Sequence, residues 1–159
     1  MESVTPERTG WRDEDISRHH RLWGIDCKAT DIDFVLAEYY AKENHVHIVA
    51  LIEYKNEHAK KPKIDSIQNR IYISLARRAD LPFFIVIYNS DFKNFYIVSG
   101  NELARRKLSC KRRHMTEYEY VKFLYKLRDL NTIPKEVLES IGYAQTEQKQ
   151  GNLFEVADL

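Results

Sequence analysis

The sequence predicts an α/β (α+β) domain built on a mixed central sheet, and three observations lead to this prediction. Apolar runs of strand length occur between residues 31 and 99. Helical periodicity precedes, separates and follows these runs, so the element order is helix, β-hairpin, helix, strand, strand, helices. The chain of 159 residues, 43% of them hydrophobic, can bury one substantial core. We expect a flexible N-terminus over 1–10, one domain over 11–143 and a polar tail over 144–159.

The first predicted elements are a short helix and a β-hairpin. Residues 11–23 have acids in the first turn of a helix, and Gly24 is a suitable stop. Two strands follow, over 31–40 and 45–55, and the turn residues 42–44 between them favour antiparallel pairing. Both faces of the first strand are apolar beyond its acids, which is typical of an interior strand.

A helix and two further strands are predicted next. The helix extends over 64–79, and its buried stripe is expected to consist of Ile64, Ile67, Ile71 and Leu75. Residues 82–88 are continuously apolar and therefore predict a central strand, and a fourth strand follows over 95–99.

Capping signals predict the helices after the fourth strand. Asn101 can cap a short helix, which is followed by a basic loop. Thr116 and Glu119 form a capping-box pattern that opens a helix to about Leu130. A last helix begins at Pro134 and ends before Gly142. The expected core stripe of the capping-box helix is Tyr120, Phe123, Leu124 and Leu127.

Composition excludes several classes of protein. Lys and Arg number 25 against 24 Asp and Glu, so the net charge predicts no polyanionic partner by itself. No apolar segment reaches the length of a membrane span, and the N-terminus lacks a secretory leader. Two cysteines, Cys27 and Cys110, are too few for a zinc site and indicate reduced thiols. We therefore expect a soluble cytoplasmic protein that does not cross a membrane.

Charged residues at the ends of the two hairpin strands are the candidate chemical site. Asp31 and Asp33 open the first strand, and Glu53 and Lys55 end the second. Strand periodicity places Glu53 and Lys55 on one face. Converging carboxylates suit Mg²⁺ or Mn²⁺, and a lysine beside such an ion can orient a water or stabilise charge on a phosphate. This combination predicts phosphodiester hydrolysis.

Asp33 followed twenty positions later by Glu53-Tyr54-Lys55, on consecutive strands, resembles the PD-(D/E)xK nuclease superfamily. The resemblance covers about residues 13–99. It implies a restriction-endonuclease-like fold and a Mg²⁺-dependent (or Mn²⁺-dependent) deoxyribonuclease, either endonuclease or exonuclease. It also implies that Asp33, Glu53 and the Tyr54 carbonyl hold the metal, with Lys55 as the catalytic lysine.

The pattern departs from the superfamily at one position and leaves two further ligands open. The proline that precedes the aspartate in the superfamily is absent here, so Asp31 is an alternative ligand to Asp33. Many members also carry a glutamate on the first helix; Glu14 is the best match, and Asp13 and Asp15 are the alternatives.

Gln68 and Tyr72 lie four residues apart and share a helix face. Gln-x-x-x-Tyr after the lysine resembles a motif of the RecB-like nuclease branch, in which the pair contacts DNA or supports the metal site. The alternative is that Gln68 completes a capping box with Asp65. Basic residues near the site are the other candidates for phosphate contacts: Arg18, Arg21, Lys60, Lys61 and Lys63.

The tail carries a separate candidate interaction motif. Gln150, Leu153 and Phe154 resemble the bacterial sliding-clamp binding motif, which would suit a bacterium or its phage as the source. The alternative is that Leu153 and Phe154 fold back onto the domain. A homodimer is a further candidate assembly, because many small nucleases dimerise. The first rival to a nuclease is a catalytically inactive nuclease-like module that binds DNA or a replication partner, and a more distant one is a structural or inhibitory protein in which the hairpin is incidental.

Overall fold

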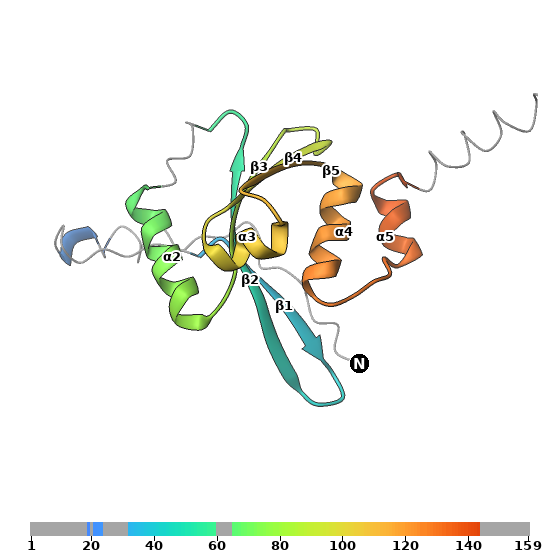
Figure 1. Ribbon diagram of the computed structural model, residues 1–159, viewed down its shortest axis with the longest axis horizontal. Helices are drawn as coiled ribbons and strands as arrows, with labels where there is room; N and C mark the ends of the chain where they lie inside the picture. Colours follow the sequence, from blue (N-terminus) through green and yellow to red (C-terminus); the bar gives the residue numbers. More distant parts are fainter. Residues whose placement is uncertain (1–18, 20, 24–31, 60–64, 144–159) are drawn as a thin grey trace, which may run out of the picture. The chain divides into compact units, whose positions relative to one another are not determined.

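The computed structural model (Figure 1) describes residues 19, 21–23, 32–59 and 65–143. The chain divides into two units, Met1–Asp31 and Ile32–Leu159. In the first unit, η1 (Arg21–Trp23) is a single 3-10 turn, and the rings of His19 and Trp23 meet edge to face at 5.7 Å. The remainder of the helix predicted over 11–23 lies outside the described residues.

A mixed five-stranded sheet forms the centre of the second unit, in the order β1-β2-β3-β4-β5. β1 (Phe34–Tyr40) and β2 (His45–Asn56) form the predicted antiparallel hairpin. β3 (Phe83–Tyr88) runs parallel to β2, while β4 (Asn94–Ser99) and β5 (Arg112–Thr116) continue antiparallel. The parallel step needs a crossover, and α2 (Ile67–Ala79) supplies it. An α/β protein with helices flanking a mixed sheet is therefore confirmed.

Two strand predictions differ from the structure. β3 is central and buried, as expected, but β1 is an edge strand with mostly exposed residues rather than an interior strand. Its hairpin with β2 projects beyond the helices, so none of the described helices covers its far end (Figure 1). The predicted basic loop contains β5, whose polar residues form a strand because β4 offers an open edge for pairing.

Helices cover the two faces of the sheet (Figure 1). α2 packs on one face, where Tyr72 and Ala76 meet Leu51, Phe83 and Ile85. On the other face lie α3 (Glu102–Leu108) and α4 (Glu117–Leu127). Their buried residues join the larger hydrophobic cluster. α5 (Lys135–Ser140) follows Pro134, and Gly142, at φ 74°, lies just beyond its end. Cys110 is a half-buried free thiol.

The predicted buried stripe of α2 is wrong. Ile67, Ile71 and Leu75 are exposed by 58%, 36% and 38%, and Ile64 lies outside the described residues. The helix instead buries Asn69, Tyr72 and Ala76, a row displaced by one residue, or about 100° of rotation. Small Ala76 lets the helix approach the sheet closely, which a row of branched residues would prevent.

The capping predictions after the fourth strand are confirmed. The Thr116 hydroxyl accepts from the Glu119 backbone N–H at 3.3 Å, and the Glu119 carboxylate accepts from the Thr116 N–H at 2.8 Å. The Asn101 side chain caps α3 by accepting from the Ala104 N–H at 2.9 Å. The predicted α4 stripe faces the core, with Leu124 half-buried. No helix in the described part of the chain is long and apolar enough to cross a membrane.

Candidate active site at the ends of β1 and β2

The hairpin register brings Asp33 opposite Glu53. Phe34, the first residue of β1, pairs with Ile52 on β2. Extending this antiparallel register by one residue places Asp33 across from Glu53. Directly opposed residues share a face, and their Cβ atoms lie about 4.5–5.5 Å apart. The two carboxylates predicted to act together therefore start from neighbouring backbone positions on the same side of the sheet.

A β-bulge makes this alignment. Near the turn, Tyr40 pairs with His45 and Ala37 with Ile48, but Leu36 pairs with Ala50, so Val49 is an extra residue on β2. With the turn-proximal register unchanged, Asp33 would lie opposite Ile52. Because a slip of one residue moves a side chain to the other face of a strand, the bulge determines that Asp33 and Glu53 occupy opposed positions on one face.

Glu53 is a charged residue inside the apolar core. Its side chain has no exposed surface, and neither carboxylate oxygen accepts a hydrogen bond. Its ionic partner is the Lys55 ammonium, two residues along the same face, whose side chain is 29% exposed. Leu51 precedes Glu53 on this face, and Ile85 pairs with it from β3. A carboxylate in such surroundings is costly unless a cation compensates it.

Tyr54 lies between these residues in sequence but points to the opposite face. Its hydroxyl is 2.7 Å from the Tyr120 hydroxyl of α4. Its ring meets the Phe34 ring edge to face at 4.8 Å between centroids. This contact joins β1 to β2 directly behind Asp33 and Glu53 and so helps to fix their register. Burial, followed by the neighbouring Tyr54, raises the pKa of Tyr120 well above its usual range.

Gln68 and Tyr72 are joined by a hydrogen bond. The Gln68 amide donates to the Tyr72 hydroxyl at 3.1 Å. Tyr72 packs in the cluster that contains Leu51, so the pair belongs to the face that carries Glu53 and Lys55. The helix cap is Ser66, which accepts from the Asn69 N–H at 3.2 Å. The capping role considered for Gln68 is thus taken by Ser66, and the Gln68 amide is directed along the helix to Tyr72.

The donors present suit a hard divalent cation. The Lys55 ammonium offsets the charge of the buried Glu53 carboxylate, and a divalent cation would bind the same carboxylate oxygens. The described residues contain no group of three or more His, Cys, Asp or Glu side chains that could enclose a metal ion. A cation here would use two carboxylates, a backbone carbonyl, water and phosphate oxygens, which is how Mg²⁺ is commonly held.

Comparison of the chain with protein-family models, with curated proteins and with solved structures finds no match. Functional inference therefore depends on the geometry of this site.

Several predicted site residues lie outside the part of the chain that the structure describes. These are the candidate ligands Asp31 and Glu14, the basic residues Arg18, Lys60, Lys61 and Lys63, the side chain of Arg21, and the tail residues Gln150, Leu153 and Phe154.

Sequence reasoning missed a contact of one buried residue and the burial of another. Tyr120 supports Tyr54 from a helix distant in sequence. Asn69 is only 3% exposed on the sheet-facing row of α2. Asn69 precedes Tyr72 by three residues and Ala76 by seven, which is the spacing of one helix face, so the sequence could have indicated this buried row.

Proposed function

We propose that this chain is a Mg²⁺-dependent deoxyribonuclease of restriction-endonuclease-like fold that hydrolyses phosphodiester bonds. One observation carries the proposal. Glu53 is fully buried and its carboxylate is paired with the Lys55 ammonium, and the hairpin register, continued by one residue beyond Phe34, places Asp33 opposite it. A protein maintains a carboxylate in such a place at a cost to its stability, which favours a functional role.

The residues would divide the work as follows. Asp33, Glu53 and the Tyr54 carbonyl would hold Mg²⁺ or Mn²⁺. When bound, the ion lowers the pKa of a water and neutralises charge on the phosphate. Lys55 would donate hydrogen bonds to the attacking water or to a phosphate oxygen, and its ion pair with Glu53 restricts where the ammonium can lie. The surrounding core, with Leu51 and Ile85, strengthens these interactions by excluding water.

The fold supports the same assignment. An antiparallel hairpin carries the acids and the lysine, and a helix then crosses to a parallel central strand. The Gln68–Tyr72 pair on that helix lies on the same face of the sheet as the lysine. We propose that Gln68 and Tyr72 contact DNA or support the metal site. Docking of the tail onto a bacterial sliding clamp and formation of a homodimer remain predictions from the sequence.

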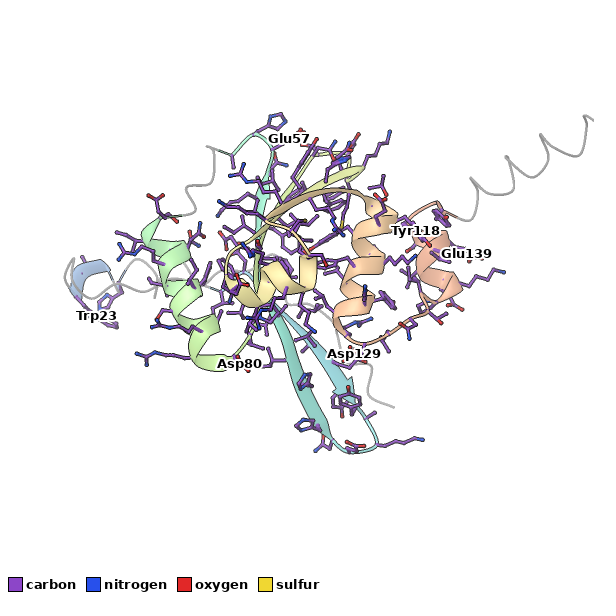
Figure 2. The ribbon with its side chains drawn as sticks, in the orientation of Figure 1. Trp23, Glu57, Asp80, Tyr118, Asp129 and Glu139 are labelled. Atoms are coloured by element: carbon purple, nitrogen blue, oxygen red, sulfur yellow. The ribbon has the colours of Figure 1, made fainter. Side chains whose placement is uncertain are left out.

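Cleavage of DNA tests the proposal. Wild-type protein should cut plasmid, linear or branched DNA with Mg²⁺ or Mn²⁺ and should be inactive in EDTA. Glu53→Gln and Lys55→Met should each lower the rate at least about a hundredfold. Glu57→Gln is the matched control, because Glu57 is an exposed carboxylate just beyond β2 (Figure 2) and should leave the rate unchanged.

Metal binding gives a readout apart from cutting. Calorimetric titration with Mn²⁺ should show binding to wild-type protein and its loss in Glu53→Gln. DNA binding without metal-dependent cutting would instead support the inactive module that binds DNA or a replication partner. Absence of both Mn²⁺ binding and DNA binding would refute both functions.

A further inference from the structure

The face of the sheet that carries Glu53 and Lys55 continues onto the last two strands. Lys55 pairs with Ile87, Ile87 with Tyr96, and Tyr96 with His114. Paired residues on neighbouring strands share a face, so these four side chains form one row across the sheet. The row begins at the candidate catalytic lysine and ends at the β5 edge.

The far end of this row is an exposed aromatic pair. Tyr96 is 51% exposed, and its ring lies 4.8 Å from the exposed His114 ring at an angle of 38°. A contact of 2.7 Å between His114 Nε2 and Asn94 Oδ1 fixes the imidazole. The hydrophobic cluster under α2 reaches β4 at Val98, one position along the same face from Tyr96. The helix therefore leaves this pair uncovered.

A basic residue, Arg112, shares the face of the pair. Arg112 is exposed, and because it pairs with Val98 it lies on the same face as Tyr96 and His114. Arg113 is also exposed, but it pairs with Ile97 and lies on the opposite face. Glu119 is the acid that faces His114 and Arg113, and its carboxylate is occupied by the Thr116 backbone and hydroxyl. Exposed rings beside a guanidinium group suit nucleotides, because rings stack on bases while cations contact phosphates.

We propose that Tyr96 and His114 form a stacking platform for unpaired bases of single-stranded DNA. The proposal deepens the nuclease function and depends on it for placing the strand's phosphate at Lys55. Two strand spacings of about 4.8 Å separate Lys55 from Tyr96, so the platform lies about 10 Å from the lysine backbone. About three stacked nucleotides span this distance. A duplex has no unstacked base to offer, so the platform selects single strands.

Binding measured without any divalent ion tests the platform. Fluorescence anisotropy in EDTA should show a labelled oligothymidine binding more tightly than its duplex with oligoadenine. Tyr96→Ala should weaken single-strand binding about 5- to 150-fold, while Tyr96→Phe keeps the ring and stays within about twofold. Arg112→Gln should reduce the slope of log affinity against log salt concentration by about one, which corresponds to the loss of one phosphate contact. Thermal melting verifies that each variant is folded.

A second exposed tyrosine–histidine pair provides a matched control. The rings of Tyr40 and His45 stack at 6.5 Å near the hairpin tip, seven residues from Asp33. Tyr40→Ala should leave single-strand binding unchanged. The platform would be overturned if Tyr96→Ala bound single strands as well as wild type, or if duplex bound more tightly than single strands. It would also be overturned if Tyr40→Ala lost as much single-strand affinity as Tyr96→Ala.

The two proposals fail separately. The platform would be refuted and the nuclease supported if metal-dependent cutting required Glu53 while single-strand binding did not change in Tyr96→Ala. Single-strand binding that needs Tyr96, without any cutting, would support the platform and refute the nuclease.

Discussion

Replacing Lys55 by methionine should destabilise the protein strongly, because it leaves the buried Glu53 carboxylate without its cation. Removing one partner of a buried ion pair costs about 3–5 kcal/mol. Lys55 is 29% exposed, so water can reach the vacated position, and we expect about 3 kcal/mol. For a chain of this length the melting temperature should fall by about 6–12 °C.

Removing both charges should have the opposite result. Glu53→Leu combined with Lys55→Met replaces the pair by apolar groups among Leu51 and Ile85. Such replacements are commonly neutral or stabilising by about 1–4 kcal/mol. The double variant should thus be as stable as wild type or more stable, yet unable to cut DNA. Urea unfolding followed by far-ultraviolet circular dichroism gives all of these free energies.

An exposed ion pair supplies the control for this measurement. Lys93 and Asp91 lie 4.0 Å apart with side chains 78% and 52% exposed, so Lys93→Met should cost less than about 1 kcal/mol. If Lys55→Met costs no more than Lys93→Met, Glu53 is not a compensated buried charge and the reasoning fails. Mg²⁺ at a hundred times its Kd should raise the free energy of unfolding of any form that binds the metal, such as wild type, by about 2.7 kcal/mol. The double variant should show no such increase.

Three further predictions concern the scaffold. Ala76→Leu should cost about 1–3 kcal/mol in urea unfolding, because Ala76 is fully buried under α2, whereas Ile71→Ser on the exposed stripe should cost less than about 1 kcal/mol. Thr116→Ala should cost about 1 kcal/mol. Hydrogen bonds from the Thr116 backbone and hydroxyl lower the pKa of Glu119. The stability that these bonds contribute is therefore full above the ordinary glutamate pKa and is lost as pH falls through the lower pKa of the folded state. Acid unfolding of wild type and Thr116→Ala measures the difference. Burial raises the pKa of Tyr120, so its contribution to stability should be full below the ordinary tyrosine pKa and decline as pH rises toward the pKa of the folded state. An absorbance titration can follow the ionisation of the tyrosine.

Local signals in the sequence were sufficient for the types and order of most elements. The caps at Asn101 and Thr116 depend on hydrogen bonds within three residues, so the sequence alone identifies them. The period of two in a strand likewise places Glu53 and Lys55 on one face without knowledge of the fold. β5 escaped prediction because its residues form a strand only when β4 provides a pairing edge.

Periodicity and capping act over a few residues, so the sequence alone was enough to predict a mixed α/β fold and an acid–lysine pair on one strand face. The buried row of α2 depends on tertiary packing, since Ile71 and Tyr72 both suit an apolar stripe and only Tyr72 packs against the sheet. The register that places Asp33 opposite Glu53 also depends on tertiary pairing, because one bulge residue, Val49, shifts the register between the turn and the site. Register depends on pairing along the whole hairpin, and burial depends on every layer that packs above it.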